Sequence, residues 1–181
     1  AATVAFSLPA IEQEGFEADD LIATYARLAV NAGQNVVIVS SDKDLMQLVR
    51  PGVELMDPIK QTMMGRDAVI EKFGVPPDHV VDVQALCGDA VDNVPGVPGI
   101  GVKTAAALIS EYGSLENLLA HATEIKQEKR RATLIQNADA ARMSYRLVKL
   151  DDAVPVQTPL SALSVRDPTL PDLRAFLVAQ G

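Results

Sequence analysis

Three short acidic motifs in the sequence could together hold metal ions. They are GFEADD, SSDKDL and GDAVDN, and they contribute seven carboxylates: Glu17, Asp19, Asp20, Asp42, Asp44, Asp89 and Asp92. A ligand set made of oxygens alone suits a hard cation such as Mg²⁺ or Mn²⁺. So many carboxylates at one place would repel one another unless cations lay between them. Two such ions can hydrolyse a phosphodiester, because one lowers the pKa of the attacking water and the other stabilises the leaving oxygen.

Each motif also has a purely structural explanation. Acids in the first turn of a helix, as in GFEADD, complement the helix dipole and cap free amides. Asp42 and Asp44 follow an apolar run, and residues two apart at a strand end point the same way. Capping the next helix needs only one of them. Asp89 and Asp92 are either solvated loop acids or neighbours on one face of a helical turn. We therefore interpret the three motifs jointly.

The charge balance depends on where the acids lie. The formal net charge is −8, which normally argues against a nucleic-acid partner because phosphate binding relies on Lys and Arg. Subtracting the seven motif acids from the 24 Asp and Glu leaves 17, against 16 Lys and Arg. If these seven surround metal ions, the rest of the molecule is nearly neutral and can approach DNA.

A glycine-rich stretch, PGVPGIGVKTAAAL (Pro95–Leu108), predicts a tight hairpin that leads into a helix. Amides at the helix start and the side chain of Lys103 would hold a DNA phosphate without reading sequence. The expected DNA contacts are Gly96, Gly99, Ile100, Gly101, Lys103 and Thr104. The alternative is a helix–helix connection whose glycines serve packing alone. The glycine spacing differs from that of a Walker motif, so we do not expect ATP binding.

The elements that position these motifs fall into two lobes. In the first lobe, residues 1–84, helices alternate with strands as in an α/β domain with a largely parallel sheet. Its expected elements are strands at 9–15, 35–41 (buried on both faces) and 53–57, and helices at 17–31, 44–49 and 67–73. The second lobe, residues 85–181, is expected to be helical. Its helices are expected at 79–88, 102–112, 115–121, 128–149 (with a break near 137–138) and 170–180, the last after an extended stretch from Asp151 to Leu170.

Composition indicates the cellular compartment. The single cysteine, Cys87, excludes an internal disulfide and suits a reducing, cytoplasmic compartment. We see no signal peptide and no apolar run of membrane-spanning length, so we expect no membrane partner. The sequence has no initiator methionine and opens directly in an expected strand, which suggests a fragment.

The order GFEADD, SSDKDL, GDAVDNVPGVPGIGVKTA resembles the flap endonuclease family, and within it the 5′→3′ exonuclease domain of bacterial DNA polymerase I. The resemblance implies a partial PIN-like sheet lobe and a helical lobe with a helix-hairpin-helix-type DNA-binding element. It also implies two divalent ions, Mg²⁺ or Mn²⁺, bound by all seven motif acids. The four acids with catalytic roles would be Asp19, Asp20, Asp42 and Asp44. Carbonyls of Val97 and Ile100 would hold a K⁺ ion.

By the same resemblance, the parent protein is a structure-specific nuclease of the bacterial nucleoid. Its substrates would be 5′ flaps, nicked duplexes and RNA primer–DNA junctions, with polymerase domains in the same parent chain. The family's first strands, which carry further acids, and its basic helical arch have no counterpart in this sequence. We therefore expect weak or absent activity and an exposed apolar sheet edge that favours association. The alternatives are a non-catalytic, structure-specific DNA-binding module and a PIN-like ribonuclease, which would lack the glycine hairpin.

Overall fold

Residues 2–180 are described by a computed structural model, which divides into two units. One unit combines the residues up to Ala32 with those from Asp151 onward, and the other is Gly33–Leu150. The boundary expected at residue 84, between an α/β lobe and a helical lobe, stays a prediction. None of the described helices is both long and apolar enough to cross a membrane.

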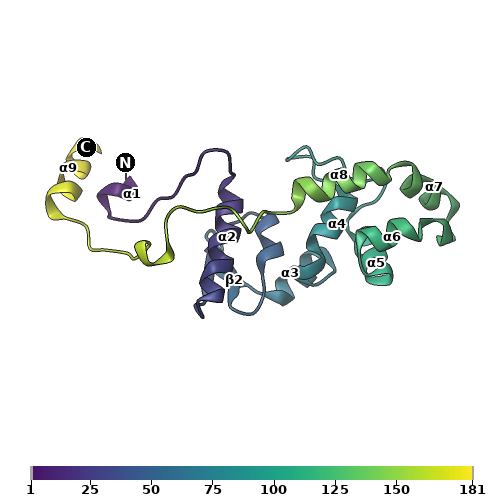
Figure 1. The fold of residues 1–181 in the computed structure, drawn as a ribbon, viewed down its shortest axis with the longest axis horizontal. Helices are drawn as coiled ribbons and strands as arrows, with labels where there is room; N and C mark the ends of the chain where they lie inside the picture. Colours follow the sequence, from purple (N-terminus) through teal and green to yellow (C-terminus); the bar gives the residue numbers. More distant parts are fainter. Residues whose placement is uncertain (1, 181) are drawn as a thin grey trace. The chain divides into compact units, whose positions relative to one another are not determined.

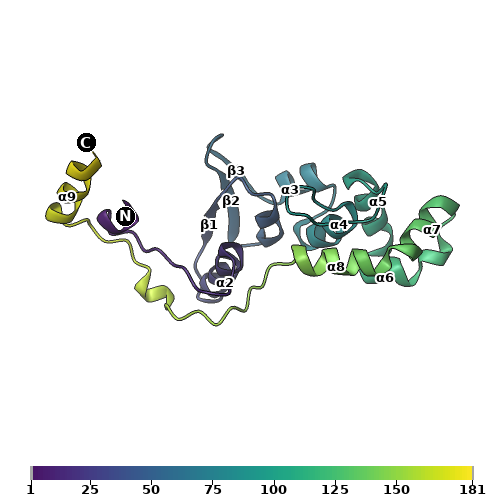
Figure 2. The ribbon, with the colours of Figure 1, turned by 90° about the horizontal axis from the view of Figure 1, so that it is seen from above.

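The unit Gly33–Leu150 begins with a small sheet in the order β1-β2-β3 (Figure 2). Strand β1 (Val36–Val39) pairs in parallel with β2 (Val53–Asp57), and β2 pairs antiparallel with β3 (Thr62–Met64). The expectation that the first of these strands is buried on both faces is wrong. Ile38 is buried, but Val37 and Val39 are 53% and 56% exposed. Side chains alternate between faces along a strand, so one face of β1 packs on the core and the other does not.

The order of the helices in this unit, with 3₁₀ turns marked η, is η1 (Asp44–Leu48), α3 (Arg66–Phe73), η2 (Pro77–His79), α4 (Val80–Cys87), α5 (Val102–Tyr112), α6 (Leu115–Ala120), η3 (Ala122–Glu124), α7 (Glu128–Gln136) and α8 (Ala138–Val148). Of these helices, η1 lies between β1 and β2, and the others follow the sheet; helices α3 to α8 form the group seen in Figure 1. The expected break near residue 137 is confirmed, because Asn137 separates α7 from α8. The expected α/β class is also confirmed, although β3 was not foreseen.

Helix α4 is central to the helical group because it packs against α5, α6 and α8. Its side chains Val80, Val83 and Leu86 are fully buried. The buried carboxylate of Asp82 accepts a hydrogen bond from the amide of Leu115 at 2.8 Å, so α4 also caps the start of α6. The C-terminal end of this well-packed helix leads directly into the third acidic motif.

The other unit contains α1 (Ala2–Ala5), α2 (Ala18–Asn31), η4 (Leu160–Ala162) and α9 (Leu170–Gln180). An extended strap after Asp151 runs along α2. Tyr25 and Arg27 donate to carbonyls of the strap at 2.8 and 2.7 Å, and the Thr24 hydroxyl bonds to it as both donor and acceptor. The strand expected at 9–15 is wrong: residues 9–13 belong to no helix or strand, and Glu14 and Gly15 form a turn in which Gly15 has a φ of +86°. Pro9 has no amide to donate to a neighbouring strand.

Candidate metal centre and nucleic-acid interface

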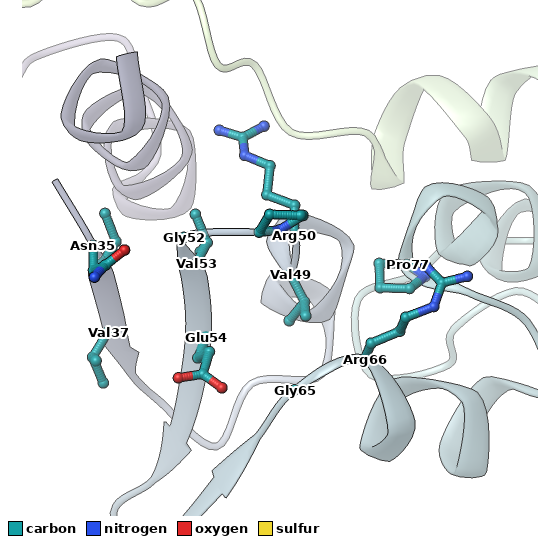
Figure 3. Close-up of a pocket in the computed structure, with 12 residues that line it drawn as sticks. Asn35, Val37, Val49, Arg50, Gly52, Val53, Glu54, Gly65, Arg66 and Pro77 are labelled. Atoms are coloured by element: carbon teal, nitrogen blue, oxygen red, sulfur yellow. The ribbon is translucent and has the colours of Figure 1, made fainter. Parts of the chain in front are cut away.

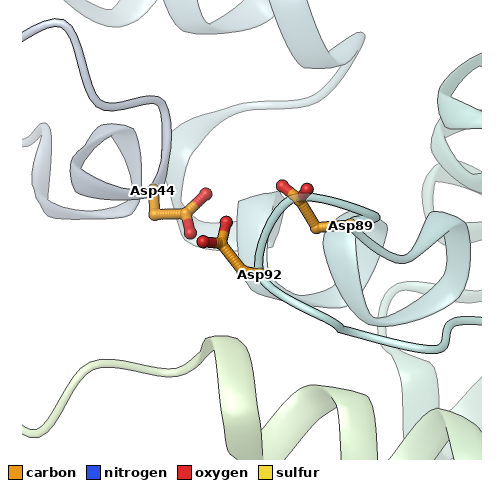
Figure 4. Close-up of side chains that lie close together, drawn as sticks. All are labelled: Asp44, Asp89 and Asp92. Atoms are coloured by element: carbon orange, nitrogen blue, oxygen red, sulfur yellow. The ribbon is translucent and has the colours of Figure 1, made fainter.

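Three of the predicted acids converge in the unit Gly33–Leu150. One carboxylate oxygen from each of Asp44, Asp89 and Asp92 lies within 4.8 Å of the other two. Asp44 begins η1, shortly after the carboxyl end of β1, whereas Asp89 and Asp92 lie on the loop after α4 (Figure 4). The carboxyl end of a strand in an α/β sheet is where ligands bind. Residues 45 positions apart in sequence thus form one acidic cluster.

The loop that carries Asp89 and Asp92 is closed by backbone hydrogen bonds. The amide of Asp89 donates to the carbonyl of Val94 at 2.9 Å, and the amide of Val94 donates back at 2.8 Å. The Asp89 carboxylate also accepts from the amide of Val91 at 2.8 Å. These bonds fix the backbone at both ends of the loop, so the positions of its acids depend little on solvent-exposed side chains.

Asp42 has a different role from its neighbour Asp44. Its Oδ1 accepts from the amide of Asp44 at 2.9 Å, and its own amide donates to the hydroxyl of Ser40 at 3.0 Å. Asp42 therefore forms an Asx turn that leads into η1, whose N-cap residue is Lys43. Its second carboxylate oxygen has no role in this turn, and its assignment as a metal ligand stays a prediction.

Lys43, which we did not single out from the sequence, lies among the three clustered acids. Its ammonium donates a short hydrogen bond to Asp89 and lies 3.8 Å from Oδ1 of Asp44 and 4.0 Å from Oδ2 of Asp92. The bond from Lys43 holds the pKa of Asp89 below its usual value, and the same bond raises the pKa of Lys43. The cluster therefore contains a cation supplied by the chain itself.

Gln84 on α4 is a second residue that the motif search missed. It is 2% exposed, and its Nε2 donates to Oδ1 of Asp44 at 2.5 Å. Burial raises the pKa of the Asp44 carboxyl, while the bond from Gln84 acts in the opposite direction. The Oε1 of Gln84 is buried without a hydrogen-bond partner. The bond from Nε2 to Asp44 is therefore the contact that this buried amide makes. The position of Gln84 four residues after buried Val80 could have revealed it.

The cluster fits a divalent cation. All three side chains offer carboxylate oxygens, the ligands that Mg²⁺ and Mn²⁺ prefer. Oxygens that bind one such ion lie no more than about 4–5 Å apart at the metal–oxygen distances that hard cations adopt. The three oxygens, which all lie within 4.8 Å of one another, meet this limit. The ammonium of Lys43 shows independently that the position accommodates positive charge.

The remaining predicted ligands, Glu17, Asp19 and Asp20, lie in the other unit, at the start of α2. Glu17 occupies the N-cap position, yet its side chain makes no capping hydrogen bond there. Oδ1 of Asp20 accepts from the amide of Asp151 at 2.8 Å and so helps to hold the strap. The capping explanation therefore does not account for Glu17. The metal-binding roles of these three acids stay predictions.

The glycine-rich hairpin is anchored by backbone contacts to α4 and α8. The amide of Gly96 donates to the hydroxyl of Ser144 at 3.0 Å, and the amide of Val97 donates to the carbonyl of Leu86 at 2.8 Å. Val97 and Ile100 are 2% and 5% exposed, so their side chains anchor the turn in the core. The carbonyl of Val97 accepts from the amide of Ile100 at 3.1 Å. The predicted K⁺ contacts are not tested by this geometry.

The hairpin leads into helix α5, as the sequence predicted. Gly101 is the N-cap residue of α5 with an extended backbone, and Lys103 is exposed one residue into the helix. The first amides of a helix have no intrahelical acceptor and attract anions. An exposed lysine beside them adds a positive charge. This end of the hairpin is therefore built to contact a phosphate, and its DNA contacts stay a proposal.

A cavity of about 460 Å³ lies at the other end of the sheet from the acidic cluster, where β1 and β2 begin (Figure 3). Its lining includes Val37, Arg50, Glu54 and Arg66. The two arginine side chains extend in different directions, and Arg66 points toward Pro77 (Figure 3). Their charges do not converge on one point, so the cavity offers no anion site and no chemistry comparable to that of the acidic cluster.

Two family models match almost the whole sequence. Residues 1–74 match the model described as "5'-3' exonuclease, N-terminal resolvase-like domain", and residues 75–170 match "5'-3' exonuclease, C-terminal SAM fold". The chain is 58% identical over 176 residues to DNA polymerase I of Rhizobium leguminosarum, covering 97% of this chain and 17% of the polymerase. It is 39% identical over 170 residues to the 5'-3' exonuclease of Aquifex aeolicus, covering 94% of this chain and 57% of that protein.

Solved structures share the fold. The chain is similar to T5 5'-exonuclease with bound zinc ions, with a TM-score of 0.74, 24% identity and coverage of 79% of this chain and 53% of that one. It is similar as well to the T5 D15 flap endonuclease in a complex with DNA and metal ions, with a TM-score of 0.72, 23% identity and coverage of 78% and 52%. The chain thus spans about half of these structures and less than two thirds of the relatives above.

Proposed function

The chain belongs to the 5'-3' exonuclease family, and on that premise we propose that it carries the 5′-nuclease function of a bacterial DNA polymerase I. It hydrolyses phosphodiester bonds at 5′ flaps, nicks and RNA primer–DNA junctions, in a parent chain that includes polymerase domains. Its place of action is the bacterial nucleoid in the cytoplasm. The family and the relatives support a 5'-3' exonuclease reaction, and the acidic cluster supports metal-dependent hydrolysis.

The observation that carries the proposal is the convergence of Asp44, Asp89 and Asp92. These three carboxylates hold a divalent cation, Mg²⁺ or Mn²⁺, and Asp42, Glu17, Asp19 and Asp20 complete a two-ion set. The bound ions supply an activated water and stabilise the leaving oxygen. Within the chain, Gln84 orients Asp44, and the closed loop from Asp89 to Val94 keeps its two acids at fixed positions.

The hairpin supplies the DNA contact. Gly96 and Gly99 shape the turn, and Gly101, Lys103 and Thr104 present amides, charge and hydroxyl to a backbone phosphate. Ile100 anchors the turn, and its carbonyl together with that of Val97 is the candidate K⁺ contact. Because such contacts read the phosphate and not the base, they fit recognition of DNA structure over DNA sequence. Lys103→Ala should weaken flap binding and reduce the slope of log K against log salt by about 1.

A second candidate is a DNA-binding module without catalysis. The observation that favours it is Lys43, whose ammonium already compensates part of the charge of the acidic cluster. A cluster neutralised in this way has less need of metal ions. The two candidates share the DNA-binding hairpin and differ in whether divalent ions bind and act.

Cleavage of a labelled 5′-flap DNA with Mg²⁺ or Mn²⁺ tests the proposal. Asp92→Asn is the informative variant, because Asp92 is 52% exposed and its loss leaves the closing bonds of the loop intact. Glu54→Gln removes an exposed acid of β2 and serves as the control. Any metal-dependent cleavage should be lost in Asp92→Asn and kept in Glu54→Gln. Flap binding without cleavage and without Mn²⁺ binding at the cluster would favour the non-catalytic module.

A further inference from the structure

Lys43 lies where a metal ion would have to bind. Its Nζ contacts Asp89, Asp44 and Asp92, and one oxygen from each of these acids lies within 4.8 Å of the others. The ammonium therefore occupies the space between the carboxylates. A divalent ion would need the same oxygens at about 2.0–2.6 Å. The two cations cannot share that space, because they would compete for the oxygens and repel each other.

The carboxylates and the lysine differ in how easily they can move. Asp44 is held by Gln84, and Asp89 is held by the amide of Val91 and by the backbone bonds that close its loop. The Lys43 side chain is 35% exposed and sits on a long flexible stem, so it can turn toward solvent. Arrival of a metal ion would displace the lysine and leave the carboxylates in place.

We propose that Lys43 is a built-in counter-cation of the acidic cluster, which a divalent metal ion must displace in order to bind. Lys43 then stabilises the metal-free protein and weakens metal binding by competition. Once the ammonium leaves, the three carboxylates carry a charge of −3, and a divalent ion compensates more of that charge than the single ammonium does. The inference rests on the proposed function in one respect, that a divalent ion binds at this cluster.

Manganese binding measured by calorimetry tests the competition. The metal-binding curves of the wild type, Lys43→Met and Lys60→Met are compared, and Asp89→Asn confirms that the heat comes from this cluster. Lys60 is a matched control because it is an exposed lysine of the same unit that pairs with Asp57 and not with the cluster. Lys43→Met should bind Mn²⁺ about tenfold more tightly, equivalent to about 1.4 kcal/mol. Lys60→Met should bind it as the wild type does.

A second measurement on the wild type does not depend on how Lys43→Met folds. In protein labelled with ¹⁵N on lysine, the Nζ signal missing from Lys43→Met identifies Lys43, and added Mg²⁺ should shift it toward the value of an exposed lysine. An unmoved signal at saturating metal would overturn the inference, as would equal or weaker Mn²⁺ binding by Lys43→Met. If the wild type binds Mn²⁺ and the variant gains nothing, the proposed function survives and the inference fails. If neither binds Mn²⁺, both fail.

Discussion

Replacing Gly96 by alanine should disturb the acidic cluster although Gly96 lies outside it. Gly96 has a φ of +61°, and a Cβ built there would lie 2.5 Å from the amide nitrogen and 2.7 Å from the Cα of Gly88. Both are backbone atoms, which cannot rotate away as a flexible side chain would. Gly99 is a matched control. Its φ is +78°, but a Cβ there would meet nothing within 4 Å.

The two substitutions share one cost and differ in another. A left-handed backbone costs an alanine about 1–2 kcal/mol, and this applies to both. Gly96→Ala adds an overpacking cost of about 1–3 kcal/mol, because Gly88 and Gly96 must separate. For a chain of this length, about 2–4 °C of Tm corresponds to 1 kcal/mol. The Tm of Gly96→Ala should therefore lie about 2–12 °C below that of Gly99→Ala.

The same clash should reach the metal ligands. Gly88 precedes Asp89, whose backbone bonds to Val94 close the loop that ends two residues before Gly96. Pushing Gly88 away from Gly96 opens this loop and moves Asp89 and its neighbour Asp92 away from Asp44. Thermal unfolding and Mn²⁺ titration of both variants measure the two effects. Equal Tm values, or unchanged Mn²⁺ affinity in a destabilised Gly96→Ala, would refute the coupling of hairpin and cluster.

Three further changes test separate parts of the structure. Amides of the following turn hold the pKa of Asp57 below its usual value. Its ionised form therefore stabilises the fold above about pH 4, and this gain is lost as the pH falls through the folded pKa. Asp57→Asn should lower Tm at pH 7, and its Tm should approach that of the wild type in acid. Gln84→Leu removes the buried amide together with its unpaired Oε1, so it should weaken Mn²⁺ binding by loosening Asp44 while leaving Tm unchanged or higher. Asp82→Ala leaves the buried amide of Leu115 without its acceptor and should cost about 1–3 kcal/mol in urea unfolding.

Sequence reasoning located the helices well because their signals are local. The expected helix at 102–112 coincides with α5, and the break expected near residue 137 falls at Asn137. Strand predictions depended on partners that a single sequence does not reveal. Among the residues that the structure describes, no strand pairs with 9–15, and β3 is too short to show a pattern.

The candidate site was predictable where its chemistry lies in residue type. Asp44, Asp89 and Asp92 were expected as ligands from motifs alone, and their convergence in the structure agrees with that expectation. Lys43 and Gln84 were missed for opposite reasons. A lysine between two aspartates reads as an ordinary charged residue, and a glutamine on an apolar helix face reads as an exception to the pattern. Both acquire meaning from residues at least 40 positions away, which only the fold brings near.

The acidic cluster and the phosphate-binding hairpin are two ends of one structural piece. Gly88, at the end of α4, begins the loop of Asp89 and Asp92, and Gly96 begins the hairpin, and their backbones touch. Ser144 of α8 ties this contact to the helical core, since its hydroxyl accepts from Gly96 and donates to a carbonyl of its own helix. A nuclease must hold a DNA phosphate at a fixed distance from its metal ligands. Two glycines in direct contact, anchored by one buried serine, set such a distance with backbone atoms, which shift less than side chains. If the hairpin binds phosphate as proposed, this contact lets a chain of net charge −8 do so, because Asp89 and Asp92 lie on the loop before the two glycines' contact and Lys103 lies on the helix after it.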